Sequence, residues 1–169
     1  CERTAELIVH WMRVGFVHGV MNTDNMSLIG ETIDYGPYGW IDNFDLNWTA
    51  NTSDAFEKRY RFGDQPQIGQ WNLAQLANAI LPLIGQAAPL QAIIDNYALN
   101  YQHKWAEMMT AKLGLQNYQG ESDLTLFHTL EKLLSDVETD MSLFYRTLAK
   151  VENDLDLQSH EHWLALFTP

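Results

Sequence analysis

Hydrophobic residues recur at helical spacing over most of the chain, and one polar segment near the N-terminus interrupts them. Residues 3–17 carry apolar positions three and four apart, which predicts an amphipathic helix that Gly15 and Gly19 bring to an end. The same periodicity returns from about residue 71 and continues through the second half of the chain. The pattern therefore predicts a mainly α protein.

The second half of the chain divides into helices at its prolines, glycines and capping residues. Asn72 is the expected N-cap of the first of these helices, and Pro82 should kink or shorten it. Pro89 is expected to open a long helix that ends at Gly114, and Ser122 to cap the next one. Two further helices are predicted from their apolar positions, which are Met141, Phe144, Tyr145, Leu148 and Val151 in one and Trp163, Leu164 and Phe167 in the other.

Between residues 17 and 47 the apolar runs become short, and Gly, Asn, Asp, Thr and Pro become frequent. Residues 26–29 and 32–33 can each form a short strand on either side of a Gly-Glu pair, so one small β-hairpin is predicted here. Residues 36–39 form a predicted turn. Residues 47–69 are a predicted extended loop, and loops of this length are usually functional or disordered.

Acidic and amide side chains are concentrated in this polar segment. Asp24 and Asn25 precede the predicted hairpin, and Asp34 follows it. A tight hairpin returns the chain on itself, so Asp34 is expected to lie beside Asn25. An amide oxygen and a carboxylate that converge in this way suit a hard divalent cation that keeps some of its waters and binds phosphates.

The order of these residues is that of a protein-kinase catalytic loop followed by its metal-binding Asp-Phe-Gly. The kinase loop reads His-Arg-Asp, with an Asn five residues after the Asp. In this chain residues 18–20 (HGV) stand in place of His-Arg-Asp, Asn25 lies five residues after the last of them, and residues 34–36 (DYG) replace Asp-Phe-Gly. Val20 cannot accept a proton, and the acidic group next to the amide is Asp24.

Each of these residues also has a purely structural interpretation. Asp24 and Asn25 can form an Asx-rich turn without any ligand, and Asp34 can mark a strand end followed by a turn. His18 is expected to hydrogen-bond the loop backbone rather than to act as a base. Asn22 can contact a phosphate or only cap the turn, and the sequence leaves both roles open.

The chain is strongly acidic, with 10 Lys and Arg against 22 Asp and Glu and a formal charge of −12. Such a surface argues against nucleic acid and anionic membranes as partners, whereas ATP can still bind through divalent cations. A single cysteine excludes an internal disulfide and fits a reducing compartment. No apolar run reaches the roughly 20 residues of a membrane span and no signal peptide is recognised, so a cytoplasmic protein is expected.

Two long motifs and several shorter ones point to one protein family. The long motifs are HGVMNTDNMS at residues 18–27 and TIDYGP at residues 32–37, and the shorter matches are Asp42 and residues 59–60, 65–66 and 71–73. Together they resemble the selenoprotein O / YdiU family, closely over residues 1–85 and more weakly over the remaining helices. The first motif is long and unusual, which makes the match specific.

The resemblance implies a kinase-like fold and a protein adenylyltransferase. Members transfer AMP from ATP to Ser, Thr or Tyr hydroxyls of proteins, because ATP lies flipped relative to its position in kinases. By motif, Asp24 is the expected catalytic acid–base, and Asn25 and Asp34 are the expected ligands of Mg²⁺ (or Mn²⁺) and of the nucleotide it carries. ATP and hydroxyl-bearing proteins are the expected partners, in the cytoplasm of a bacterium.

The resemblance also predicts that this chain is one part of a larger enzyme. Residues 1–169 are expected to be a single C-lobe fragment, divided into a catalytic and metal-binding segment (1–47), an extended loop (48–70) and a helical region (71–169). In the family, a Gly-rich loop and a Lys–Glu pair lie upstream, and we recognise no equivalent in this sequence. We therefore expect activity in the full-length parent, and weak or no ATP binding by the fragment alone.

Two other functions stay open at this point. A protein or small-molecule kinase could use the same residues, although Val20 in the place of the kinase Asp argues against it. A non-catalytic helical interaction module, or pseudoenzyme fragment, would explain why the phosphate-binding elements of the other lobe are not recognised here.

Overall fold

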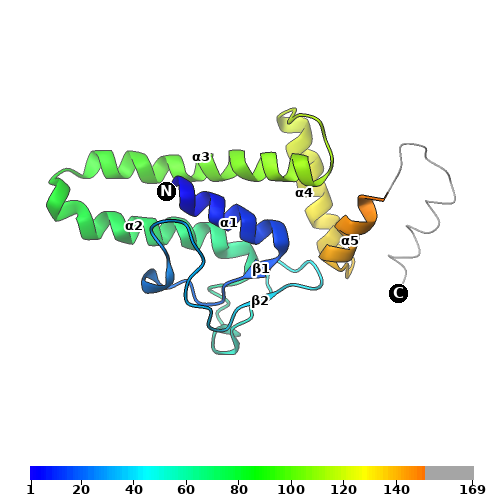
Figure 1. Cartoon of the computed structure of the whole chain (residues 1–169), viewed down its shortest axis with the longest axis horizontal. Coiled ribbons are helices and arrows are strands. Elements are labelled where there is room, and N and C mark those ends of the chain that lie inside the picture. The colour runs from blue at the N-terminus through cyan, green and yellow to red at the C-terminus, as the bar shows by residue number, and fades with distance from the viewer. Residues whose placement is uncertain (151–169) are drawn as a thin grey trace.

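The computed structural model describes residues 1–150, which are mainly helical with one small sheet (Figure 1). The predicted mainly α class with a small antiparallel sheet is confirmed. Within this range no helix is both long enough and apolar enough to cross a lipid bilayer. The elements are α1 (Glu2–Val14), β1 (Phe16–Val17), η1 (Thr23–Asn25), β2 (Gly39–Trp40), η2 (Thr52–Asp54), η3 (Phe62–Asp64), α2 (Gln65–Ile84), α3 (Ala87–Lys112), α4 (Glu121–Asp136) and α5 (Met141–Leu148), where η marks a 3₁₀ turn.

Helices α2 and α3 run antiparallel to each other, and α1 packs against both (Figure 1). The contact is tightest at Gly69, where a Cβ would lie 2.3 Å from Ile8 Cδ1 and 2.9 Å from Tyr97 Oη. Ile8 is fully buried, and the Tyr97 hydroxyl donates to Pro66 O at 3.1 Å. Burial of a side chain of this size contributes about 1.5–3 kcal/mol, so this contact fixes the position of α1 on α2.

The N-terminal helix is shorter than the predicted 3–17. It ends at Val14 because Gly15 adopts a left-handed conformation with φ of 72°, and the Gly15 N–H bonds back to the last-turn carbonyls of the helix. The two residues that follow form β1 instead of a further helical turn. The glycine signal therefore marked the helix end correctly, and the extension to residue 17 was wrong.

The sheet lies elsewhere than the sequence predicted. β1 pairs antiparallel with β2, with Phe16 opposite Trp40 and Val17 opposite Gly39. Residues 26–34 contain no strand, so the hairpin predicted there is wrong. The two strands that do pair are joined by residues 18–38, and this long connection contains the candidate catalytic residues.

Residues 26–34 do not form strands, because this segment lies along the surface of α1 and is bonded to it. Gly30 has φ of 78° and lies so close to α1 that a Cβ there would be 2.8 Å from Arg3 Cβ. Trp11 Nε1 donates to Thr32 Oγ1 at 2.9 Å. Since side chains of other elements bind this segment, its strand-like apolar residues never meet in a ladder of backbone hydrogen bonds.

Helix α2 begins earlier than predicted. Asp64 is its N-cap residue, and Pro66 lies in the first turn, where the missing N–H of proline has no helical partner to lose. Asn72 is therefore not an N-cap, and it lies inside the helix at 6% exposure. Pro82 lies in the last turn, and the helix ends at Gly85 with φ of 74°. The polar first turn has no apolar periodicity, which is why the sequence did not reveal it.

The later helices follow the sequence more closely. α3 has Pro89 in its first turn and Gly114, with φ of 70°, just past its end. α4 begins after Gly120 without a side-chain cap, so the predicted capping role of Ser122 is wrong. α5 is capped by Asp140, whose carboxylate accepts a backbone N–H of the first turn. The predicted last helix, around residues 163–167, lies outside the described residues.

The chain after β2 is attached to α4 and α5. Met141 N donates to Asp42 O at 2.8 Å, and Phe44 N donates to Thr139 O at 2.9 Å. A buried apolar cluster covers this junction and contains Val17, Ile41, Phe44, Phe62, Leu134, Met141 and Phe144. The small sheet is thus connected to the C-terminal helices as well as to α1.

Lys112 at the end of α3 connects three helices. Its Nζ donates to Arg13 O in the last turn of α1 at 2.6 Å, and it lies 3.7 Å from the ring centroid of Tyr145 on α5. Burial, with a smaller contribution from the Arg13 charge, lowers the pKa of Lys112 to about 8. The unpaired carbonyls in the last turn of a helix favour a nearby cation, which accounts for the Lys112 amine at the end of α1.

Candidate functional site

The candidate catalytic residues lie on two adjoining segments between β1 and β2. We call residues 18–25 the Asp24 loop and residues 26–38 the Asp34 loop. The Asp24 loop ends in η1, which leaves Asp24 exposed and Asn25 half-buried. The Asp34 loop is exposed along most of its length. The two loops are adjacent in the chain, but different contacts hold them.

The first residue of α2 holds the start of the Asp24 loop. Gln65 is fully buried, and both ends of its amide are used: Oε1 accepts from His18 N at 3.0 Å, and Nε2 donates to Phe16 O at 2.9 Å. These bonds satisfy backbone groups that have no partner where β1 ends. Removing Gln65 would leave two buried backbone groups unpaired, at about 1–3 kcal/mol each.

Two further amides bind carbonyls in the middle of the Asp24 loop. Asn51, the N-cap residue of η2, donates from Nδ2 to Gly19 O at 3.1 Å, and Asn72 on α2 donates to Met21 O at 2.9 Å. Gly19 has φ of 82°, and a Cβ there would lie 2.3 Å from Pro37 O. Glycine is therefore required where the Asp24 loop passes the Asp34 loop.

Asn25 is oriented by the Asp24 loop itself. Its Nδ2 donates at 3.1 Å to the carbonyl of Val20, the residue that stands in place of the kinase Asp. Oδ1 is then the free end of the amide, and no group among residues 1–150 donates to it. An amide oxygen presented in this way is a suitable ligand for a hard cation.

His18 connects the two loops. Its Nε2 lies 2.8 Å from Ile33 O, so this nitrogen carries the hydrogen and donates to the residue before Asp34. The ring is 1% exposed and packs against the rings of Trp11 and Phe16, with centroids 5.4 and 6.4 Å away. The prediction that His18 hydrogen-bonds the loop backbone is confirmed. A ring buried to this extent is not accessible to a substrate.

Asp34 occupies an exposed turn with an unusual backbone. Its φ of 54° lies in the left-handed region, which aspartate tolerates better than most residues other than glycine. Its carbonyl accepts from Gly36 N at 2.8 Å, which closes a tight turn directly after the His18 bond. A tight turn, and not a strand end, therefore presents the carboxylate to solvent.

Both loops are bonded to residues 18–20, but the candidate residues are not bonded to one another. Residues 18–20 bond Asn25 on one side and the residue before Asp34 on the other. Within residues 1–150, no hydrogen bond or ion pair links Asp24, Asn25 and Asp34 to one another. Asp24, at the centre of η1, and Asp34 are both exposed, whereas Asn25 is half-buried.

The available oxygen atoms fit a magnesium-type cation. The Asp34 carboxylate and the Asn25 amide oxygen are hard ligands, and Mg²⁺ combines one or two protein carboxylates with waters and phosphate oxygens. In the described part of the chain, no group of three or more His, Cys, Asp or Glu side chains could hold an ion by itself. A cation at these residues would therefore complete its coordination with nucleotide oxygens and water.

Asn22 is bonded from outside the loop. It is the N-cap residue of η1, but its side chain makes no capping bond, and its Oδ1 accepts from the Tyr60 hydroxyl at 2.6 Å. Beside Tyr60, the Arg59 guanidinium lies 4.8 Å from the ring centroid of Trp71. The observed role of Asn22 is thus a bond to the segment that precedes α2, in place of the capping that the sequence allowed.

Exposed aromatic rings gather beside Asp34. Tyr35, Tyr38 and Trp40 are 59%, 42% and 54% exposed, and the centroids of successive rings lie 5.2 and 5.5 Å apart. Phe16 adds to this cluster from β1, at 5.4 Å from Trp40. Aromatic faces next to a candidate phosphate site can pack against the ring or apolar surface of a ligand.

Sequence reasoning missed the residues that support the site. The sequence placed Gln65 in a family motif but predicted no role for it, and it predicted that Asn72 caps a helix. Asn51 and Tyr60 lie in the predicted extended loop. One signal was available in principle. An amide side chain in the apolar part of a helix, as at Asn72, is buried only when it is hydrogen-bonded.

The family can now be assigned. The profile of the family described as protein adenylyltransferase SelO matches residues 1–167. The chain belongs to this family. The resemblance stated from the motifs is confirmed, and it extends over the later helices as well as over residues 1–85.

Curated relatives in the family carry the name protein nucleotidyltransferase YdiU. The one from Rhodopirellula baltica is 58% identical over 152 residues, which are 90% of this chain and 28% of the relative. The one from Aromatoleum aromaticum is 59% identical over 152 residues, which are 90% of this chain and 29% of the relative. The one from Flavobacterium johnsoniae is 54% identical over 151 residues, which are 89% of this chain and 29% of the relative. The chain thus spans less than a third of the length of these relatives.

Proposed function

We propose that this chain supplies the catalytic base and the metal ligands of a protein adenylyltransferase when it is part of a full-length protein. The reaction would move AMP from ATP to Ser, Thr or Tyr hydroxyls of proteins, with residues 1–169 as the C-lobe portion of a kinase-like fold. One observation carries the proposal. In a chain of the SelO family, an exposed carboxylate at Asp24 adjoins an amide at Asn25 whose oxygen is free and oriented.

In the proposed reaction, Asp24 acts as the general base. The hydroxyl oxygen of the protein substrate forms a bond to the α-phosphorus of ATP, and the bond from that phosphorus to pyrophosphate breaks. The hydroxyl proton passes to the Asp24 carboxylate, and pyrophosphate leaves with the bonding electron pair. The amides that hold the Asp24 loop fix the backbone that leads to this carboxylate, so part of the cost of orientation is met before the substrate binds.

Asn25 and Asp34 are the proposed ligands of Mg²⁺ or Mn²⁺. When bound, the ion would offset the negative charge of the phosphates and of the pyrophosphate leaving group. The bond to Val20 O engages the Asn25 Nδ2 and leaves its Oδ1 available to a ligand. The bond from His18 fixes the backbone one residue before Asp34. The Asn25 side chain and the backbone beside Asp34 are thus positioned by separate contacts with residues 18–20.

Family membership supports AMP transfer over the alternative of phosphate transfer. Labelled ATP separates the two, because an adenylyltransferase transfers the α-phosphate and a kinase transfers the γ-phosphate. Full-length protein is incubated with Mg²⁺, a soluble protein mixture and ATP labelled at either position. We expect the α label on protein and no transfer of the γ label.

Substitution tests the residue roles in the same assay. Asp24→Asn and Asp34→Asn are each expected to lower labelling by about 10²- to 10⁴-fold, the range of a general acid–base group. Asp95→Asn, at an exposed position of α3, is the matched control and should retain labelling. All variants should unfold at the same temperature as the wild type. Undiminished labelling in the first two variants contradicts the roles, and γ-label transfer identifies a kinase.

A further inference from the structure

Arg59 is a cation without an anionic partner in the described part of the chain. No carboxylate there lies within 4 Å of its guanidinium, whereas Arg61, two residues further along, is paired with Asp64 at 2.9 Å. The carboxylate of Asp54 serves the backbone instead: its two oxygens accept the N–H groups of Arg59 and Tyr60 at 2.9 and 2.8 Å. The local structure therefore fixes the backbone of Arg59 and leaves its charge unpaired.

Two aromatic rings hold the Arg59 guanidinium. Its central carbon lies 4.8 Å from the ring centroid of Trp71 and 5.6 Å from that of Tyr60. Trp71 is 44% exposed and Arg59 is exposed, so this contact is open to solvent. A ring attracts the guanidinium through its face, while the five N–H donors of the group point outward along the edge of its plane. The group is thus oriented, and its donors stay available to a ligand.

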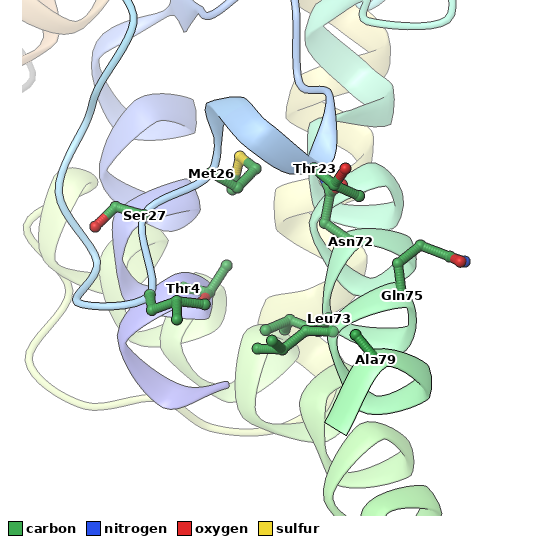
Figure 2. Close-up of a pocket in the computed structure, with 10 residues that line it drawn as sticks. Thr4, Thr23, Met26, Ser27, Asn72, Leu73, Gln75 and Ala79 are labelled. Atoms are coloured by element: carbon green, nitrogen blue, oxygen red, sulfur yellow. The ribbon is translucent and has the colours of Figure 1, made fainter. Parts of the chain in front are cut away.

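The supports of Arg59 are attached to the Asp24 loop. The Tyr60 hydroxyl donates to Asn22 Oδ1 at 2.6 Å. Trp71 directly precedes Asn72, which lies beside Thr23 in Figure 2 and donates at 2.9 Å to the loop carbonyl just before Asn22. Tyr60 and the helical turn that carries Trp71 are therefore both bonded to the two residues that begin three positions before the proposed base.

Asn22 adds a second free donor at this place. The bond from Tyr60 engages its Oδ1, and its Nδ2 has no acceptor among the described residues. The Asn22 side chain is exposed, as Arg59 is. A guanidinium and an amide nitrogen both offer donors and no acceptor. Such a pair suits an oxyanion, either a phosphate or a carboxylate, and disfavours a cation or an apolar group.

Resting on the proposed function, we infer that Arg59 and Asn22 form an oxyanion site for one of the two reactants. Two sources present this chemistry. One is a phosphate of ATP, because Asn25, a proposed metal ligand, lies three residues beyond Asn22. The other is an Asp or Glu side chain of the protein substrate close to the acceptor hydroxyl. The chain has a formal charge of −12, so an unpaired guanidinium here reduces the repulsion that either anion meets.

Calorimetry tests the phosphate source and needs no transfer reaction. Full-length protein with Mg²⁺ is titrated with α,β-methylene-ATP, an analogue that cannot release pyrophosphate. If the oxyanion is a phosphate, Arg59→Gln should raise Kd by about 10- to 100-fold, the range of a hydrogen bond between charged groups. Arg59→Lys keeps the charge but loses the planar fork, and its Kd should lie between. Arg146→Gln, at an exposed position of α5, is the matched control and should bind like the wild type.

Peptides test the carboxylate source. They carry one acceptor Thr, with Glu or Gln at each position up to four residues before or after it, and transfer of α-labelled phosphate is measured. If the oxyanion is a carboxylate, kcat/KM at one position should be about 10- to 100-fold higher with Glu in the wild type and in Arg146→Gln. In Arg59→Gln, Glu and Gln should be equal at that position. Labelling of the Gln peptide should be the same in all three proteins.

Asn22→Asp separates ligand binding from support of the loop. The new carboxylate still accepts the Tyr60 hydroxyl, but it replaces the free donor with a negative charge. We expect the unfolding temperature to stay near that of the wild type, and the oxyanion identified by Arg59→Gln to bind at least about tenfold more weakly. Unchanged binding of that oxyanion in Asn22→Asp overturns the two-residue site.

The outcomes separate this inference from the proposed function. Transfer of the α label with nucleotide affinity and Glu preference both unchanged in Arg59→Gln overturns the inference and leaves the adenylyltransferase proposal standing. Absence of α-label transfer to any protein or peptide defeats the proposed function, and the carboxylate source with it. In that case an Arg59-dependent Kd for the nucleotide analogue still supports the phosphate source, and a Kd that does not depend on Arg59 overturns the inference as well.

Discussion

The Asp24 loop and the Asp34 loop adjoin in the chain, but different parts of the molecule hold them. The Asp24 loop is bound at successive backbone groups by amides that come from α2 and η2, namely Gln65, Asn72 and Asn51. The Asp34 loop is bound by side chains at residues 32 and 33, and most of its residues are exposed. The first half of the Asp24 loop is therefore held by the packed interior, although Asp24 itself is exposed, and the Asp34 loop lies over the surface of α1.

This difference suggests separate tasks for the two loops. A base must be held close to one position for proton transfer, and side-chain amides that bond the loop backbone provide that rigidity. A segment that binds a metal and its nucleotide can be ordered by the ligand, and such segments have few buried contacts. Variants of the supports can test whether the two loops are stable to different degrees.

The largest expected effect is that of Gln65→Leu. This change leaves His18 N and Phe16 O buried without partners, and it should lower the free energy of unfolding by about 2–5 kcal/mol. Urea unfolding of the full-length protein measures it. Gln67→Leu, an exposed position on the same helix, is the control and should change stability by less than about 0.5 kcal/mol. Similar values for the two variants would show that the Gln65 bonds do not support the Asp24 loop.

Gly30→Ala should have a smaller effect that is confined to the Asp34 loop. The new Cβ would lie closer to the backbone and side chain of Arg3 than van der Waals contact allows. Residue 30 also has a positive φ of 78°, which alanine rarely adopts. The expected cost is about 1–2 kcal/mol. Hydrogen exchange should then speed up in residues 26–38 and stay unchanged in residues 18–25. Gly36→Ala, where the added carbon meets open space, is the stability control.

Addition of Mg²⁺–ATP should act mainly on the Asp34 loop. Ligand binding is expected to slow amide exchange there by about tenfold, equivalent to about 1.4 kcal/mol, and to slow exchange in the Asp24 loop by less than about twofold. Exchange measured by mass spectrometry on the full-length protein resolves the two segments. Asp34→Asn should abolish the protection. Equal protection of both loops would remove the distinction between a preformed and an adjustable segment.

Thr32→Val is expected to give the smallest effect. It removes the acceptor of the Trp11 Nε1 hydrogen bond at a half-buried site, and it should cost about 0.5–1.5 kcal/mol. Thr32→Ser keeps a hydroxyl and serves as the control in thermal unfolding. If both variants unfold like the wild type, this hydrogen bond does not hold the Asp34 loop on α1.

The sequence predicted features that depend on neighbouring residues. The end of α1 at Gly15 and the end of α3 before Gly114 follow from glycine's access to positive φ, and both were found. The long motifs at residues 18–27 and 32–37 indicated a family, and family membership is confirmed. The hairpin at residues 26–34 failed because it was inferred from local strand propensity. The actual partner of β1 lies at Gly39–Trp40, beyond the predicted hairpin.

By itself, the sequence determined the helical class, several helix ends and the set of candidate catalytic residues. Hydrophobic periodicity, glycine positions and motifs each depend only on residues that are close together in the chain. The tertiary structure alone decided what holds those residues. The local pattern predicted that Asn72 caps a helix. In the structure its buried side chain instead donates a hydrogen bond to the carbonyl of Met21, 51 residues away in the chain. An amide side chain bonds whichever backbone group the packing of α1 on α2 brings within about 3 Å, and no local pattern specifies that group.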